Sequence, residues 1–135
     1  MSEVFVLDSS ILVDDLRTGC HHDRIAEIDG VLRNSSVVLA ELWRGANSQA
    51  DREILDSLER NYPNLTPTTN NWLESGRLLA KINADRGFEP RKLRALHFDM
   101  LIALTVRTHG ARLITSNRAD YELIRKYRNF KLEVW

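Results

Sequence analysis

The chain has 135 residues, which suits one compact domain and leaves little room for a second, so we expect a single domain over residues 1–135. With 43% hydrophobic and 28% charged residues, it has the composition of a protein that builds a core, which excludes a mainly disordered chain. Lys plus Arg and Asp plus Glu are 19 each, so the chain lacks the excess positive charge typical of a basic nucleic-acid-binding module.

The sequence contains no apolar run long enough to cross a membrane, and its start lacks the basic residues of a signal peptide. Cys20 is the one cysteine, so no disulfide can form within the chain. We therefore expect a cytoplasmic protein that does not bind a membrane.

The first half of the chain predicts two strands, each followed by helices. In chain order we expect a strand at 4–7, a helix from Ser9 to a turn at Gly19, a short helix at 23–28, a strand at 30–33, a capping segment at 34–36, and helices at 37–45 and 49–60.

The second half continues the alternation of strands and helices. In chain order we expect a strand at 65–68, a helix at 70–86, a polar and basic loop at 87–96, a helix at 98–109, a strand at 111–114, a turn at 115–117, a short helix, and a strand at 131–135. Trp72 and Leu73 are expected to be core contacts of the helix at 70–86. This order predicts an α/β fold with a central parallel sheet of four to five strands and helices on both faces.

Acidic residues occupy positions where a parallel sheet gathers its functional groups. Asp8 follows the first strand directly, and ligand sites in such sheets form beyond the carboxyl ends of the strands. Glu41 and Asp99 each interrupt a strongly apolar helix, so we expect both side chains to be partly buried. Asn117 and Asp120 follow the fourth predicted strand and can reach the same edge. The sequence therefore predicts that these side chains, distant along the chain, converge.

Converging buried carboxylates need a compensating cation, because an unpaired buried charge is strongly unfavourable. Mg²⁺ fits this need, since it prefers oxygen ligands and often binds through few carboxylates together with water and substrate phosphate. The four histidines do not show the spacing of a zinc site. Oxygen-only coordination is therefore the favoured interpretation.

Each acidic residue alone also has a purely structural interpretation. Asp8 fits a helix cap after a strand, Glu41 can pair with a neighbouring arginine, and Asp99 can cap or pair with Lys92 or Arg94. The combination favours a functional site more than any single residue does.

Four motifs in order resemble those of the PIN-domain family. They are Val6-Leu7-Asp8-Ser9-Ser10, then Ser35 with Leu39-Ala40-Glu41-Leu42 and Gly45-Ala46, then Asp99-Met100-Leu101-Ile102-Ala103, and then Leu113-Ile114-Thr115-Ser116-Asn117 with Asp120-Tyr121. The size and the closing segment 131–135 are similar to the VapC toxins of bacterial and archaeal toxin–antitoxin pairs. The resemblance covers essentially the whole chain.

The resemblance implies an endoribonuclease that depends on Mg²⁺ or Mn²⁺, usually a homodimer, and held inactive by a VapB-type antitoxin. By position, Asp8, Glu41 and Asp99 match the three main acidic residues of the family, with Asp8 and Asp99 as the primary metal ligands. Asp120 is the candidate fourth carboxylate, because Asn117 carries no charge. The residues expected to organise the site by hydrogen bonds are Ser9, Ser10, Thr115, Ser116 and Asn117.

An acidic site does not attract RNA, so positive charge must flank it. The densest basic group lies in the predicted loop before Asp99, and Arg17, Arg44 and Arg118 follow the acidic motifs. The residues expected to contact RNA phosphates are Arg91, Lys92, Arg94 and Arg118. The alternative for each of them is an ordinary solvated surface charge.

Three other functions remain open at this point. The first is a catalytically inactive PIN-like module that binds RNA or protein, and the second is a nuclease that cuts DNA by the same phosphodiester chemistry. The third is a phosphotransfer or nucleotide-binding domain that uses Asp8. That reading is weakened because the chain lacks a glycine-rich phosphate loop, and Asp8-Ser9-Ser10 lacks the second Asp of Asp-nucleophile phosphatases.

Overall fold

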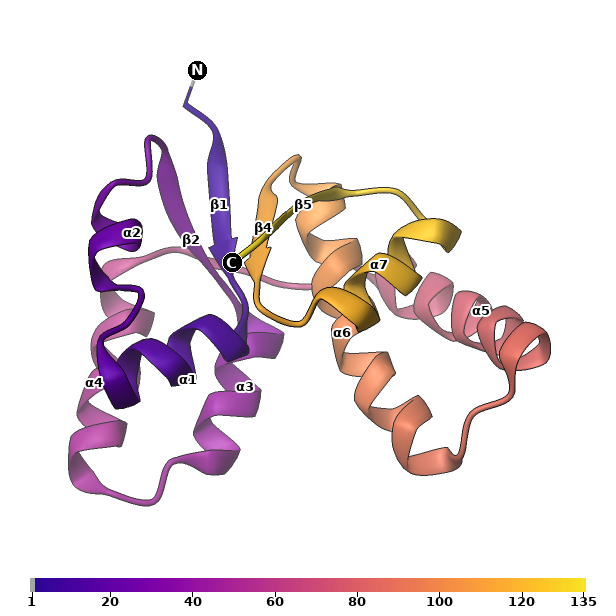
Figure 1. The fold of residues 1–135 in the computed structure, drawn as a ribbon, viewed down its shortest axis with the longest axis horizontal. Coiled ribbons are helices and arrows are strands. Elements are labelled where there is room, and N and C mark those ends of the chain that lie inside the picture. Colours follow the sequence, from indigo (N-terminus) through magenta and orange to yellow (C-terminus); the bar gives the residue numbers. More distant parts are fainter. Residues whose placement is uncertain (1) are drawn as a thin grey trace.

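The computed structural model describes residues 2–135 and contains one sheet of five parallel strands in the order β3-β2-β1-β4-β5 (Figure 1). The strands are β1 (Val4–Leu7), β2 (Val31–Ser35), β3 (Asn64–Leu65), β4 (Arg112–Thr115) and β5 (Lys131–Val134). The expected α/β fold with a central parallel sheet is thereby confirmed.

The helices cover both faces of the sheet. They are α1 (Ser9–Thr18), α2 (His22–Ala26), α3 (Ser36–Gly45), α4 (Gln49–Asn61), α5 (Thr69–Arg86), α6 (Pro90–Thr108) and α7 (Arg118–Tyr127). Successive residues of a strand point to opposite faces, so Phe5 and Leu7 pack with Ile11 of α1 on one side. Val6 points to the other side, where it joins the larger core built from α3, α5, α6 and α7.

The strand order reverses direction at β1, which fixes the position of the site. From β1 the chain builds β2 and β3 on one side and then returns to add β4 and β5 on the other. β1 and β4 are therefore neighbours, with Leu7 opposite Ile114. Asp8 follows the end of β1 and Thr115 ends β4, so both lie at the switch point where parallel sheets form their ligand crevices.

The prediction of a loop over residues 87–96 is wrong for most of its length. Gly87, with φ of 67°, ends α5, but α6 already begins at Pro90. Proline is favourable at the first position of a helix, because the N–H that it lacks would have no partner there. Arg91, Lys92 and Arg94 therefore belong to a helix that continues through Asp99.

Two strand boundaries also differ from the prediction. The strand at 65–68 is wrong beyond Leu65, since β3 ends there and the following segment contains Pro67, which has no N–H for a ladder. β2 extends to Ser35, so Asn34 is a strand residue instead of a cap. Its buried amide donates to the carbonyl of Leu58 at 2.7 Å, which attaches β2 to α4. Ser35 does cap α3, and its Oγ accepts from Val38 N at 3.3 Å.

The predicted inner face of α5 is wrong at its first turn. Trp72 and Leu73 are 53% and 55% exposed, and the buried stripe runs instead through Asn71 and Ser75 to Leu78 and other apolar residues. Because Asn71 and Ser75 on the buried side are polar, hydrophobic periodicity does not identify this stripe. Within residues 2–135, none of the helices is both long and apolar enough to span a membrane.

Candidate active site

Asp8 is the most tightly fixed acidic residue. Its carboxylate is 3% exposed and accepts hydrogen bonds from three hydroxyls. Ser10 Oγ and Thr115 Oγ1 donate to Oδ2 at 2.9 and 2.7 Å, and Tyr121 OH donates to Oδ1 at 3.0 Å. Asp8 stands at the N-cap position of α1, as the structural interpretation expects, but its side chain makes no capping hydrogen bond. Three elements, α1, β4 and α7, instead hold one buried carboxylate in place.

Asp99 and Glu41 bring two further carboxyl groups into the same region from the middle of α6 and α3. Burial, followed by repulsion from Asp8, raises the pKa of Asp99 to about 8 and that of Glu41 to about 7. Arg44 lowers the pKa of Glu41 in part, but its guanidinium lies over the ring of Phe98, 5.2 Å from the centroid. Within residues 2–135, neither carboxylate forms an ion pair, and the buried Oε1 of Glu41 has no hydrogen-bond partner.

Tyr121 is a site residue without an assigned role in the sequence analysis. It is fully buried, and besides Asp8 its hydroxyl reaches Asp99 Oδ1 at 3.3 Å. Burial and the nearby Asp8 raise the pKa of Tyr121 further above its ordinary value, so the hydroxyl stays protonated and acts as a donor. The signal in the sequence that could have identified Tyr121 as a site residue was its position next to Asp120 in the fourth motif. Hydrophobic periodicity alone predicts an ordinary core aromatic.

Replacing Tyr121 by Phe should loosen the two carboxylates that the hydroxyl bridges. We expect the free energy of unfolding to fall by about 1–2 kcal/mol, and the affinity for Mn²⁺ and RNA cleavage to fall about tenfold each. Urea unfolding and Mn²⁺ titration measure these effects. Tyr127→Phe is the matched control, because the Tyr127 hydroxyl bonds Asp85, outside the acidic cavity. Unchanged Mn²⁺ affinity and cleavage in Tyr121→Phe would show that the bridge has no role.

The strand-to-helix turn after β4 orders the remaining polar residues. The backbone N–H of Ser116 donates to Ser10 Oγ at 3.2 Å, and that of Asn117 donates to Thr115 Oγ1 at 3.0 Å. The side-chain amide of Asn117 then donates to Asp120 Oδ2 at 3.2 Å. These contacts agree with a supporting role for the turn.

The acidic residues line one open cavity of about 690 Å³ at the carboxyl edge of the sheet. Its polar lining includes Asp8, Ser9, Ser10, Glu41, Asp99, Ser116, Asn117 and Asp120, and its basic lining consists of Arg44, Arg91 and Arg94. Two predicted RNA contacts lie outside this lining. Lys92 pairs with Asp120, and Arg118 projects from the start of α7, 3.9 Å from Glu122.

The residues present fit a hard divalent cation such as Mg²⁺ or Mn²⁺. Among the described residues, no three Asp, Glu, His or Cys side chains are close enough to ligate one ion together. Mg²⁺ commonly binds through one or two carboxylates and completes its shell with water and phosphate. Asp8 and Asp99, which share the Tyr121 hydroxyl, offer such a pair, and Glu41 adds a carboxylate oxygen that has no hydrogen-bond partner among residues 2–135.

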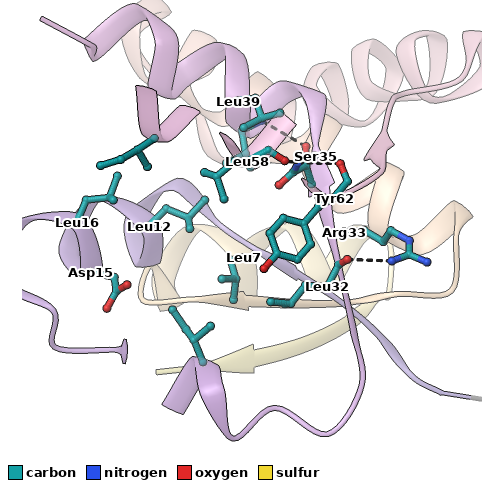
Figure 2. Close-up of a pocket in the computed structure, with 14 residues that line it drawn as sticks. Leu7, Leu12, Asp15, Leu16, Leu32, Arg33, Ser35, Leu39, Leu58 and Tyr62 are labelled. Atoms are coloured by element: carbon teal, nitrogen blue, oxygen red, sulfur yellow. Dashed lines mark hydrogen bonds between the residues drawn. The ribbon is translucent and has the colours of Figure 1, made fainter. Parts of the chain in front are cut away.

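A second depression, of about 170 Å³, is apolar and lies between α1, α2, β2 and α4. Figure 2 shows Leu12, Leu16, Leu39 and Leu58 grouped around it with the ring of Tyr62. Leu16 also lines a third depression, which shares Ser9, Val13, Glu41 and Arg44 with the acidic cavity. The apolar groove, defined by these leucines and Tyr62, thus leads along α1 towards the acidic site.

Comparison with known proteins identifies the fold. DNA-bound VapBC from Salmonella typhimurium is similar, with 20% sequence identity and a TM-score of 0.74, and the match covers 100% of this chain and 99% of that one. VapBC2 from Rickettsia felis bound to a DNA fragment from their promoter has 19% identity and a TM-score of 0.74, with 98% of each chain covered. VapBC-1 from nontypeable Haemophilus influenzae has 20% identity and a TM-score of 0.71, again with 98% of each chain covered. No curated protein matches the sequence. A family model described as the PIN domain matches residues 5–127, and the chain therefore belongs to the PIN-domain family.

Proposed function

We propose that this protein is an endoribonuclease dependent on Mg²⁺ or Mn²⁺ and the toxin of a VapBC-type toxin–antitoxin pair. The observation that carries the proposal is the shared cavity of Asp8, Glu41 and Asp99 at the sheet switch point, where Glu41 Oε1 has no hydrogen-bond partner in the described part of the chain. Membership of the PIN-domain family and similarity to VapBC complexes support it. The cytoplasmic location and the homodimer are further parts of the proposal, and the homodimer rests on the family resemblance alone.

Each acidic residue has a distinct part in the proposed reaction. Asp8 and Asp99 would hold the cation, and the hydroxyls around Asp8 fix the orientation of its carboxylate. When bound, the cation supplies Lewis-acid chemistry: it polarises the phosphodiester and favours ionisation of water. Glu41, whose Oε1 has no donor among the described residues, would orient the attacking water or take its proton.

The direct test is incubation with single-stranded RNA and DNA of matching sequence, with Mg²⁺, Mn²⁺ or EDTA. We expect cleavage of the RNA in both metals, none in EDTA, and little or no cleavage of the DNA. Cleavage that is equally fast in EDTA would contradict the proposed metal dependence. Cleavage of the DNA alone would show that the substrate is DNA and not RNA.

Arg91 and Arg94 on the first turns of α6 are expected to attract RNA phosphates. Both are exposed and line the acidic cavity. We expect a weaker salt dependence of RNA binding when both are replaced by Ala in an inactive Asp99→Asn background. The slope of the logarithm of the RNA-binding constant against the logarithm of the salt concentration should fall in magnitude by about 1.4, since each phosphate contact on a single strand contributes about 0.7. Fluorescence anisotropy at several salt concentrations measures the slope. Replacing the exposed pair Arg60 and Arg77 by Ala serves as the control. An unchanged slope in the Arg91 and Arg94 variant would show that these two arginines do not contact RNA phosphates.

The apolar groove is the surface that we assign to the antitoxin. Its rim includes Leu16, which is 44% exposed, and apolar side chains so placed suit the buried face of a partner segment. Because the groove continues towards the acidic cavity, one partner chain could cover both. The proposed inhibition is therefore steric exclusion of RNA by a VapB-type antitoxin.

A further inference from the structure

The fourth carboxylate, Asp120, is already paired within the chain. Lys92 Nζ lies 2.7 Å from Asp120 Oδ1, and the amide of Asn117 lies 3.2 Å from Oδ2. Both oxygens therefore accept a hydrogen bond, one of them from a full positive charge. Asp120 is 19% exposed and Lys92 is 37% exposed, so the pair is only partly screened by solvent.

The early start of α6 makes this pair possible. Lys92 precedes Asp99 by seven residues in the same helix, which is close to two full turns, so the two lie on one face. α7, which carries Asp120, packs against α6. Asp120 is also near enough to Asp99 to contribute to its raised pKa. The lysine therefore stands beside the acidic cavity and neutralises Asp120, one of the carboxylates that line it.

This pairing separates Asp120 from the other acidic residues. Among the described residues, Asp8, Glu41 and Asp99 have no Lys or Arg at ion-pair distance, whereas Asp120 has one at 2.7 Å. A carboxylate that is paired in this way attracts a second cation weakly, and the ammonium repels that cation directly. Recruiting Asp120 as a ligand would require the ion pair to open.

We propose that Lys92 takes the place of a second metal ion, so that the site binds one divalent cation through Asp8 and Asp99, and Asp120 positions Lys92. This inference rests on the proposed metal-dependent nuclease function. If the inference holds, Lys92 does not contact RNA, because its ammonium pairs with Asp120 within the site.

Counting bound Mn²⁺ tests the inference without reference to activity. In a titration that follows free Mn²⁺ by electron paramagnetic resonance, we expect one ion per chain for the wild type. Lys92→Met and Lys92→Gln should each bind two, with affinity for the second ion at least tenfold higher than in the wild type. Lys92→Arg keeps the positive charge and should bind one, as should Lys81→Met, which removes an exposed lysine of α5. The double variant Lys92→Met, Asp120→Asn should again bind one Mn²⁺ ion per chain.

Two outcomes would overturn the inference: two ions in the wild type, or one ion in both neutral variants of Lys92. If the wild type binds two ions and still cleaves RNA, only this inference fails. If it binds no ion and cleaves no RNA, the proposed function fails with it. Circular dichroism of each variant shows that the counts refer to folded protein.

Discussion

Asp8→Asn and Asp99→Asn are each expected to lower Mg²⁺-dependent RNA cleavage by about 10³-fold or more while the protein stays folded. The substitution keeps the size of each side chain but removes the charge that holds the cation, so the reaction loses its main electrostatic stabilisation. Asn can still take part in the hydrogen bonds around residue 8, because the surrounding hydroxyls can donate or accept. Cleavage assays under single-turnover conditions measure the loss.

The matched control is Asp56→Asn, which removes an exposed carboxylate of α4 outside the cavity. Its activity should stay within twofold of the wild type. Circular dichroism and urea unfolding separate loss of chemistry from loss of fold. Wild-type activity in either Asp8→Asn or Asp99→Asn would remove these residues from the mechanism.

The metal-free protein should become less stable as the pH rises, and Mg²⁺ should reverse this. Asp99 and Glu41 have folded-state pKa values of about 8 and 7, above their ordinary values of 3.8 and 4.5. Below about pH 4 both groups are protonated whether the chain is folded or not. Between pH 4 and 8 the unfolded chain releases these protons more readily, so their contribution to folding is lost as the pH rises. We expect the Tm to fall by about 5 °C or more between pH 5 and pH 9.

Asp99→Asn isolates this effect from every other titrating group. It lacks the Asp99 titration, so its Tm without metal should exceed that of the wild type at pH 9 and approach it at pH 5. Mg²⁺ at one hundred times its dissociation constant should stabilise the wild type by about 2.7 kcal/mol, and the variant much less. Differential scanning calorimetry with and without EDTA measures both. A wild-type advantage in Tm at pH 9 without metal would show that Asp99 is not held in a repulsive site.

The sequence predicted the sheet well because parallel strands carry a strong local signal. Val4–Leu7 is a short apolar run and β4 contains the apolar pair Leu113-Ile114, and the parallel direction of the strands follows from the alternation of strands and helices. The start of α6 was missed because residues 90–96 begin with proline and contain three basic residues, a pattern shared by loops and first turns of helices. That error concealed Lys92 as a partner of Asp120.

The convergence of acidic residues could be predicted, but their hydrogen-bond partners could not. Asp8 follows a strand, and Glu41 and Asp99 interrupt apolar helices, so charge in a buried position was visible in the sequence. The Tyr121 hydroxyl joins Asp8 and Asp99 across 113 and 22 residues, a contact that depends on tertiary packing. Hydrophobic periodicity does not distinguish that tyrosine from an ordinary core aromatic.

The claim that Asp8 and Asp99 hold a divalent cation is tested most directly by a crystal structure with Mn²⁺, using its anomalous scattering. We expect one strong peak at the acidic cavity, with carboxylate oxygens of both residues as ligands and Glu41 facing the same ion through water. No peak there at saturating Mn²⁺, in crystals of protein that cleaves RNA in solution, would contradict it.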